Sequence, residues 1–259
     1  MRTGRNIVEL AANPPRFDVA SVKEVEWRQG AGASRTEPGR IDYRQIFIKT
    51  LVLKAYGLAG YQVVWPAWVE HTQSATYDIS ATFPPGTTTE QLHLMLQELL
   101  ADRFKLSFHR ETRDTKVYAL QISDGGLKIH KAANPPADDD SSFSSGVFED
   151  RLWHVTRSLP GAPATVPSGL RISTFTEVFN DRSLFDRILV DRTGLEGFYD
   201  IDLKLPPGDK TIFPERGAVP DIPELLSGME KQLGLKAEKK TLPIEIMVID
   251  HLEETPTPD

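Results

Sequence analysis

Residues Tyr77–Gly86 read Tyr-Asp-Ile-Ser-Ala-Thr-Phe-Pro-Pro-Gly, and Tyr199–Gly208 read Tyr-Asp-Ile-Asp-Leu-Lys-Leu-Pro-Pro-Gly with the same spacing. In both stretches every second residue is apolar, which is the pattern of a half-buried strand. Pro-Pro-Gly ends both strands, because proline has no N–H for the ladder and glycine allows the turn. The repetition predicts an α+β fold made of two similar units.

Each unit is predicted to have the order β-α-β-β-α-β-β, with mostly antiparallel strands and its helices on one face of the sheet. The first unit takes residues 14–131, a partly ordered linker takes 132–166, and the second unit takes 167–259. The linker is predicted because Asn134–Gly146 is rich in Pro, Asp and Ser. Residues from Thr255 onward are expected to form a frayed polar tail.

The clearest helix is predicted after Gly86. Either Thr87 with Glu90 or Thr88 with Gln91 can form a capping box at its start. Its leucines and methionine then recur at the spacing of one helical face. An earlier helix is predicted over about 45–56, ending at Gly57. Two hairpins are predicted after the second helix of each unit, one with its turn at Thr112–Lys116 and one over 235–249.

Composition narrows the possible functions. The chain has 259 residues, 39% hydrophobic, with 30 basic and 37 acidic residues, a net charge of −7 and a pI near 5.5. This balance argues against a nucleic-acid binder, which needs clustered Lys and Arg. There is no cysteine, so disulfides and thiolate–metal sites are excluded. No apolar run approaches the roughly 18 residues of a membrane span, and residues 1–12 lack a signal-peptide apolar core.

Several ordered motifs resemble one bacterial family. They are Phe17-Asp-Val-Ala-Ser-Val-Lys23, Leu53-Lys-Ala-Tyr-Gly57, Leu99-Leu-Ala-Asp-Arg-Phe-Lys-Leu106, His109-Arg-Glu-Thr-Arg113, Val190-Asp-Arg-Thr-Gly-Leu-Glu-Gly-Phe-Tyr-Asp200 and Val248-Ile-Asp-His251. The chain resembles an uncharacterised soil-associated family that is expanded in acidobacteria. Related domains occur behind the membrane metallopeptidase of β-lactam-sensing receptors, and members usually carry a secretion signal. The resemblance therefore implies an extracytoplasmic module, periplasmic or secreted, and supplies no catalytic residue.

Known catalytic motifs are absent from the sequence. It contains no Gly-x-Ser-x-Gly elbow, phosphate-binding glycine loop, dinucleotide fingerprint or His-Glu-x-x-His helix. The six histidines show no metal-ligand spacing, so no metal and no cofactor is predicted. Asp78, Asp200 and Asp202 at the starts of the repeated strands are either an acid–base pair across an interface or strand-start hydrogen-bond acceptors.

Two groups of side chains are candidate binding residues. Tyr61, Trp65 and Trp68 either line a groove for a peptide or glycan or close the core end of the first unit. His109 and Arg110, on a strand with Glu111, form either an anion or acid–base site or cross-strand charge pairs on a solvated face.

Trp153 is a further candidate, because the linker has enough apolar residues to dock. We expect it to be partly buried and to anchor the linker against one unit.

Two functional classes remain after this reading. The first is a non-enzymatic extracytoplasmic binding or sensing module whose partner is a protein, peptide or glycan of the cell envelope. The second is a hydrolase whose site is assembled from scattered Asp, His and Arg residues. A pocket that gathers three or more such side chains would favour the hydrolase, whereas a shallow groove or an open strand edge would favour binding.

Overall fold

The structure is a computed structural model that describes residues 14–28, 33–71, 76–135, 147–149, 152–155, 169–181, 185–205 and 221–258. Its helices and antiparallel-rich sheets confirm the predicted α+β class. The chain divides into two compact units: unit 1 is Met1–Thr112 with Glu245–Asp259, and unit 2 is Arg113–Ile244. Both boundaries fall inside long strands, so the units differ from the predicted ones, which split the chain at a linker.

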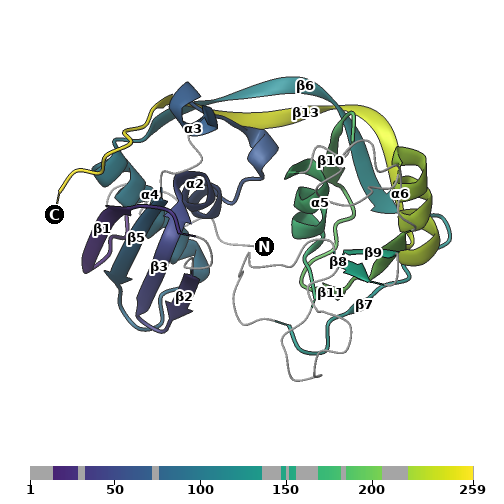
Figure 1. The fold of residues 1–259 in the computed structure, drawn as a ribbon, viewed down its shortest axis with the longest axis horizontal. Helices are drawn as coiled ribbons and strands as arrows, with labels where there is room; N and C mark the ends of the chain where they lie inside the picture. The colour runs from purple at the N-terminus through teal and green to yellow at the C-terminus, as the bar shows by residue number, and fades with distance from the viewer. Residues whose placement is uncertain are drawn as a thin grey trace, which may run out of the picture. The chain divides into compact units, whose positions relative to one another are not determined.

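Unit 1 contains a four-stranded antiparallel sheet in the order β1-β5-β3-β2, drawn with its helices in Figure 1. Its elements are β1 (Val19–Val25), β2 (Ala33–Glu37), β3 (Arg40–Phe47), α2 (Ile48–Tyr56), a 3-10 turn (Gly60–Gln62), β4 (Val63–Val64), α3 (Ala67–His71), β5 (Thr76–Thr82) and α4 (Thr89–Phe104). One face of the sheet is buried with α2 and α4 in a single core. Period-2 patterning in β3 and β5 produces this buried face, because alternate side chains of a strand point the same way.

Helix α4 follows the sequence prediction closely. Thr88 is its N-cap: the Thr88 hydroxyl accepts from the Gln91 N–H at 3.2 Å, and the Gln91 side chain accepts from the Thr88 N–H at 2.9 Å. Its buried residues are Leu92, Met95, Leu96, Leu99, Leu100 and Phe104. Helix α2 starts at Ile48, later than predicted, because β3 continues through a bulge at Gln45, whose φ is +50°.

Thr88→Ala is expected to lower the free energy of unfolding by about 1 kcal/mol, because the Gln91 N–H loses its acceptor. Urea unfolding checks this value. Thr87→Ala is the matched control, since the Thr87 hydroxyl donates to the Pro84 carbonyl outside the helix. An equal loss in both variants would contradict a specific capping role.

Residues 253–258 are hydrogen-bonded to the rest of unit 1, so the prediction of a frayed tail is wrong. The N–H groups of Glu253 and Thr257 donate to the carbonyls of Phe104 and Arg103, at 2.8 and 2.7 Å. The Tyr77 hydroxyl donates to the Glu254 carbonyl at 2.5 Å. Carbonyls at the end of a helix lack partners within the helix, and here the tail supplies them.

Unit 2 is built from shorter strands. Its elements are β7 (His130–Lys131), β8 (Val147–Glu149), β9 (Leu152–Val155), α5 (Ile172–Asp181), β10 (Ile188–Asp191), β11 (Tyr199–Asp200), β12 (Leu203–Leu205), α6 (Ile222–Gly228) and a π-helical turn (Met229–Leu233). Strand β11 pairs with β7, and β9 pairs with β12 on one side and with β8 on the other. Residues 77–82 belong to one continuous strand, whereas 199–205 divide between β11 and β12 in different sheets, so the structure does not confirm the predicted repeat.

Two long strands replace the two predicted hairpins. They are β6 (Ser107–Ile122) and β13 (Leu235–His251), which are neighbours in the strand order β10-β6-β13-β4. Strand β10 pairs in parallel with β6, and β4 pairs in parallel with β13. Thr112–Lys116, predicted as a turn, contains neither glycine nor proline, and its polar side chains are tolerated in an extended, mostly exposed strand.

Candidate functional site

A pocket of about 390 Å³ lies in unit 1 beside the start of β1. Volumes of about 300–1,000 Å³ are typical of ligand pockets. Two segments more than seventy positions apart in the sequence form it, the residues entering β1 and one flank of α4, and we call it the β1–α4 groove. Its lining residues are Arg16, Phe17, Asp18, Val19, Ala20, Met95, Glu98, Leu99, Asp102 and Arg103.

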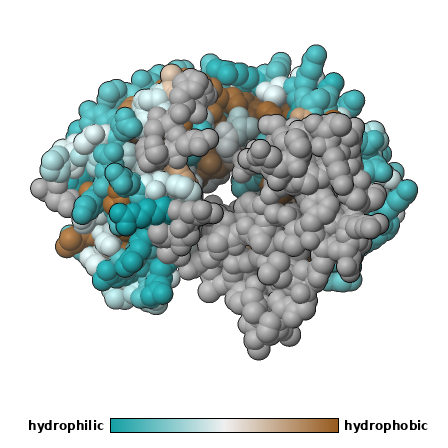
Figure 2. All heavy atoms as spheres, viewed as in Figure 1, coloured by the Kyte–Doolittle hydropathy of each residue, from teal (hydrophilic) through white to brown (hydrophobic). Residues whose placement is uncertain are grey.

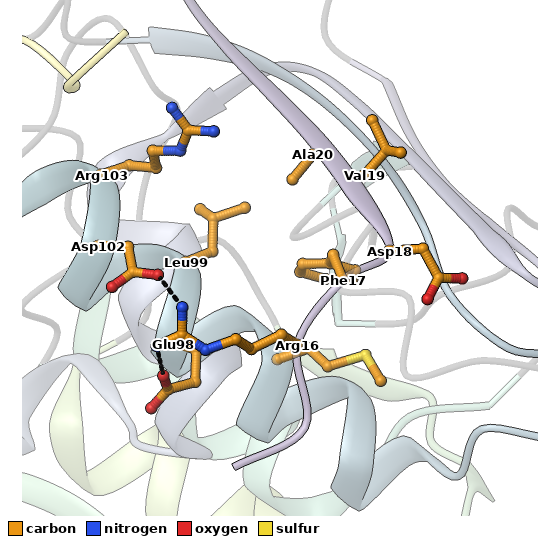
Figure 3. A pocket seen from close by; sticks show the side chains of 10 residues that line it. Arg16, Phe17, Asp18, Val19, Ala20, Glu98, Leu99, Asp102 and Arg103 are labelled. Atoms are coloured by element: carbon orange, nitrogen blue, oxygen red, sulfur yellow. Dashed lines mark hydrogen bonds and ion pairs between the residues drawn. The ribbon is translucent and has the colours of Figure 1, made fainter. Parts of the chain in front are cut away.

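The middle of the β1–α4 groove is apolar. Figure 3 shows Phe17, Ala20 and Leu99 directed into the space between the two segments, whereas Asp18 turns away from it. Met95 and Leu99 are only 5% exposed and belong to the core of unit 1, so the floor of the groove is the edge of that core. The spacing of the α4 residues places them on one flank of the helix.

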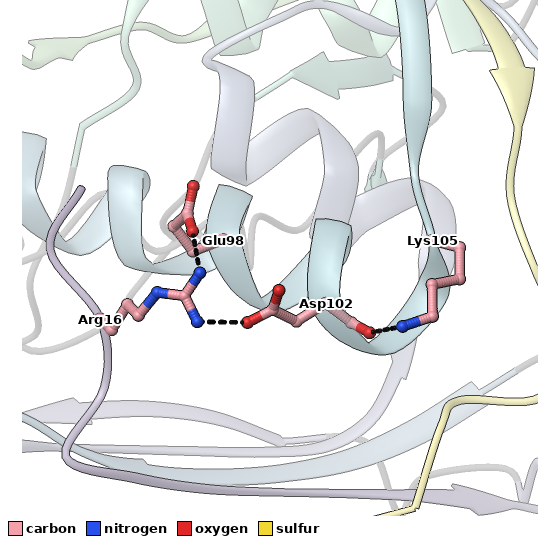
Figure 4. A network of polar contacts seen from close by, with 4 residues as sticks. All are labelled: Arg16, Glu98, Asp102 and Lys105. Atoms are coloured by element: carbon pink, nitrogen blue, oxygen red, sulfur yellow. Dashed lines mark hydrogen bonds and ion pairs between the residues drawn. The ribbon is translucent and has the colours of Figure 1, made fainter. Parts of the chain in front are cut away.

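Arg16 closes one end of the groove with two ion pairs. Its Nη1 donates to Asp102 Oδ2 at 2.8 Å and its Nη2 donates to Glu98 Oε2 at 2.9 Å, as Figure 4 shows. The two carboxylates are one helical turn apart, so the guanidinium also relieves their mutual repulsion. Lys105 donates to the Asp102 carbonyl at 2.7 Å. Arg16 is 59% exposed, so its ion pairs position the segment entering β1 more than they stabilise the fold.

Strand β5 lies between β1 and β3. The register of the sheet determines which of its backbone N–H and C=O groups point to β1 and which point to β3. On the β3 side the Phe83 N–H donates to the Gly39 carbonyl at 3.0 Å, and Arg40 is the partner of Thr82. Paired residues alternate between bonded and non-bonded pairs along antiparallel strands. The odd-numbered residues of β5 therefore bond to β3, and the even-numbered ones face β1.

The even-numbered residues of β5 have Val19, Ser21 and Lys23 as their partners in β1. The backbone N–H and C=O groups of the alternate residues, Ala20 and Val22 among them, therefore point away from β5. Strand β1 is the last in the strand order, and within the described part of the chain no strand pairs with this outer side. The β1–α4 groove thus lies directly beside a sheet edge that no described strand occupies.

The predicted aromatic residues lie elsewhere in unit 1 and are half-buried. Trp65 and Trp68 pack against its core, and Trp68 Nε1 donates to the Leu252 carbonyl at 3.2 Å. The ammonium of Lys49 lies 5.8 Å from the centre of the Trp65 ring. Tyr61 lies in the 3-10 turn before β4. These contacts fit the interpretation in which the aromatic residues close the end of the core, and a binding role stays a prediction.

His109 and Arg110 are exposed and take part in charge pairs with residues of β13. His109 Nδ1 is 2.8 Å from Asp250 Oδ1, and Arg110 pairs with Glu245. The Arg110 guanidinium also lies 5.9 Å from the centre of the Phe108 ring. Both pairs lie on neighbouring strands, which matches the cross-strand alternative. The sequence could not reveal the partners, because Asp250 is 141 residues away from His109.

The structure does not bring the remaining predicted residues, Trp153 and three aspartates, together in one site. Trp153 lies in β9, which pairs with β8 and β12 in unit 2, and its side chain is outside the described part of the structure. Asp78 in unit 1 accepts from the Gln45 N–H at 2.9 Å, which supports the bulge of β3. Asp200 and Asp202 lie in unit 2, and Asp202 is 3.4 Å from the Lys204 ammonium.

Exposed apolar side chains are few on the described surface. In Figure 2 the described atoms are mainly teal or white, and brown is confined to separate small areas. The exposed large apolar residues are Val19, Trp27, Phe47, Val64 and Ile122. Val19, at 68%, is the most exposed of them, and it lines the β1–α4 groove.

Two further findings concern the described residues as a set. Their His, Asp and Glu side chains form no group of three or more that is able to hold a metal ion. None of their helices has the length and apolar character that crossing a membrane requires.

An ion pair on the solvent face of the unit 1 sheet lowers the pKa of Asp42. Hydrogen bonds from Arg40 (2.5 and 2.9 Å) and the Ser80 hydroxyl (2.5 Å) lower this pKa from 3.8 to about 2. The folded protein therefore gains stability from this group at neutral pH and loses it as the pH falls through the window between 3.8 and about 2.

Arg40→Met is expected to destabilise the protein at pH 6 and to have a progressively smaller effect as the pH approaches 2. Urea unfolding at a series of pH values measures the difference between the two proteins. A difference that stays constant with pH would contradict the assigned interaction. Carboxyl NMR titration gives an independent readout, because the Asp42 pKa should rise toward 3.8 in the variant.

The β1–α4 groove is not among the sites predicted from the sequence. Two of the motifs that carry the family resemblance, Phe17–Lys23 and Leu99–Leu106, contribute residues to it from opposite sides. Neither motif shows a chemical pattern of its own, because the groove consists of ordinary apolar and charged side chains brought together by the fold. The signal available in the sequence was the pair of motifs, and their proximity was not predictable from them.

A family model described as "Protein of unknown function (DUF3738)" matches residues 49–252. No curated protein and no solved structure matches the chain.

Proposed function

The chain belongs to the family of proteins of unknown function DUF3738, and from this premise we propose that it is a non-enzymatic binding module for a polypeptide ligand outside the cytoplasm. The observation that carries the proposal is the β1–α4 groove, which has an apolar floor, a charged rim and a free strand edge beside it. Such a combination offers both side-chain and backbone contacts to a ligand. The extracytoplasmic location is supported by the family resemblance of the motifs.

The charged residues of the groove also fit binding better than catalysis. Arg16, Glu98 and Asp102 are engaged with one another in ion pairs, and Arg103 Nη1 donates to the carbonyls of Thr257 and Pro258, at 3.2 and 2.6 Å. Groups held in this way orient the walls of a groove. Among the described residues, the outward-facing N–H and C=O groups of β1 have no strand as a partner and are available to a ligand.

Methionine methyl NMR tests the location of the binding site. With ¹³C-methyl methionine in the full chain, we expect a blocked hexapeptide with alternating threonine and apolar residues to shift the Met95 resonance. Met229 is the matched control, because it is fully buried in the core of unit 2. A shift of Met229 with no change at Met95 would overturn the proposed site, as would the absence of any shift at millimolar peptide.

A groove-filling variant supplies the second arm of this experiment. Ala20→Phe places a large side chain in the groove, where Figure 3 shows the Ala20 methyl group pointing inward. The peptide-dependent shift of Met95 is expected to disappear while the spectrum of the free protein keeps its dispersion. Persistence of the shift in this variant would mean that the peptide binds elsewhere and acts on Met95 indirectly.

Cell fractionation tests the proposed location independently of the groove. In the native host the protein is expected in the envelope or medium fraction together with periplasmic or secreted markers. Recovery with cytoplasmic markers alone would contradict the extracytoplasmic part of the proposal and leave the binding part standing.

A further inference from the structure

We propose that the ligand is an extended segment with apolar residues at alternate positions, which adds to β1 as a further strand and places one apolar side chain in the β1–α4 groove. This inference rests on the proposed function and specifies its ligand. It starts from β1, which has β5 as its strand neighbour on one side and, among the described residues, none on the other. Free strand edges pair readily with extended chains, because their N–H and C=O groups are already aligned for a ladder.

The direction of the free backbone groups fixes how such a strand pairs. The N–H and C=O groups of Val19 and Ser21 point toward β5, where their partners are Thr82 and Ser80. Those of Ala20 and Val22 therefore point outward. An antiparallel strand therefore exchanges hydrogen bonds with Ala20 and Val22. All described pairings of this sheet are antiparallel, which makes the same geometry the natural extension.

The same register determines where the side chains of the ligand point. Ala20 and Val22 are half-buried and pack against the core that α4 covers. Residues directly opposite one another on paired strands point to the same face of the sheet. The ligand residue opposite Ala20 therefore directs its side chain toward the flank of α4, above Phe17 and Leu99, and its neighbours in sequence point to solvent.

Apolar chemistry is expected at the inward-facing ligand positions. The floor of the groove is made of Phe17, Met95 and Leu99, and burying a leucine-sized side chain there contributes about 1.5–3 kcal/mol. The outward-facing positions lie over the solvent face of the sheet, beside Ser21 and Lys23, and favour polar residues. The recognised class is thus a segment of alternating apolar and polar residues.

A pair of N-methylated peptides separates strand addition from other modes of binding. The parent probe is a blocked, fluorescein-labelled hexapeptide in which threonine alternates with valine, leucine and valine. Its central leucine is both the residue that enters the groove and the residue whose N–H faces β1. Methylation of that amide nitrogen is expected to weaken binding about tenfold or more, through the lost hydrogen bond and the steric block at the edge.

Methylation of the neighbouring threonine nitrogen is the matched control, because that N–H points away from β1. We expect the affinity of this peptide to stay within about threefold of the parent, since no ladder hydrogen bond is lost. Fluorescence anisotropy with the full chain measures all three affinities. Equal affinity of the two methylated peptides would overturn strand addition.

A protein variant provides the reciprocal test. Ala20→Pro removes the outward N–H of Ala20 and leaves the bonds to β5 in place, a substitution that edge strands tolerate. We expect binding of the parent peptide to weaken about tenfold with a small change in melting temperature. Should this variant fail to fold, the methylated peptides still decide the question.

The Met95 methyl signal separates failure of this inference from failure of the proposed function. If Met95 shifts equally with both methylated peptides, the groove binds peptide and strand addition is wrong. If no peptide shifts Met95, the proposed site itself is wrong. If sedimentation shows that the chain self-associates and that Ala20→Pro makes it monomeric, the occupant of the edge is a second copy, and the inference of a separate peptide ligand is overturned.

Discussion

Gly234→Ala is expected to lower the free energy of unfolding by about 3 kcal/mol or more, through backbone strain and a steric clash together. Gly234 ends the π-helical turn with φ +70°, a conformation that L side chains rarely adopt. A Cβ atom there would lie 2.1 Å from the Gly126 carbonyl oxygen and 2.9 Å from the Lys128 nitrogen. Both neighbours are backbone atoms, so relief requires movement of the chain.

The segment that would have to move is itself hydrogen-bonded to this turn. The Ser123 N–H donates to the Gly234 carbonyl at 2.9 Å, and the Lys128 N–H donates to the Leu233 carbonyl at 3.0 Å. Displacing residues 123–128 would therefore strain or break these bonds as well. Urea unfolding followed by circular dichroism measures the loss.

Gly57→Ala is the matched control for this variant. Gly57 also has a positive φ, +61°, at the end of α2, but a Cβ atom there meets nothing within 4 Å. Only backbone strain remains, and the expected loss is about 1 kcal/mol. If Gly234→Ala lowers the free energy of unfolding no more than Gly57→Ala does, the close approach of Gly234 to residues 126–128 is contradicted.

Phe104→Ala is expected to lower the free energy of unfolding by about 3–5 kcal/mol, because it leaves a large cavity in the core of unit 1. The Phe104 side chain is fully buried and its ring packs edge-on against the Tyr77 ring, with centroids 5.0 Å apart. Tyr77 in turn is fixed by its hydrogen bond to the Glu254 carbonyl. The variant therefore loosens the packing of α4 against β5 and the C-terminal residues.

Phe104→Leu separates the loss of packing volume from the loss of the aromatic contact. It keeps most of the buried volume, and about 1.5 kcal/mol or less is expected. Similar large losses in both variants would point to the aromatic contact as the main contribution. A loss below about 1 kcal/mol for Phe104→Ala would contradict the placement of this residue in a packed core.

Local patterns in the sequence predicted the elements that local physics determines. The capping box at Thr88, the apolar face of α4 and the glycine after α2 were confirmed, because each depends on residues within a few positions of one another. The N-cap of α6 is equally local, since the Asp221 carboxylate accepts from the Glu224 N–H at 2.8 Å. The α+β class follows from such elements.

Pairings over long distances could not be predicted in this way. In residues 104–122 and in residues 235–249, apolar and polar residues alternate on both sides of a polar stretch. This pattern is typical of two short strands joined by a turn, and a hairpin was therefore predicted in each run. In the structure residues 107–122 and 235–251 are each one strand, because pairing between β6 and β13 outweighs the polar side chains of Thr112–Lys116, and Phe104 ends α4. The contacts of the C-terminal residues could not be predicted either. Their hydrogen-bond partners, Arg103 and Phe104, are about 150 residues away in the sequence.

The candidate site shows the same limitation. The residues predicted from the sequence, Trp65, Trp68 and His109 among them, have distinctive side-chain chemistry, but in the structure they take part in core packing or pair with an acidic side chain. The β1–α4 groove consists of ordinary residues whose arrangement matters more than their identity. A free strand edge in particular is a property of the backbone, and no side-chain pattern records it.

Residue-specific amide hydrogen exchange in the free and peptide-bound protein tests the central claim most directly. Binding along β1 predicts an alternating result: the Ala20 and Val22 amides exchange more slowly in the complex, while the Ser21 and Lys23 amides, already directed toward β5, change little. The alternation follows from the register alone and does not depend on the affinity. Uniform protection along β1, or protection confined to other strands, would contradict a ligand added at this edge.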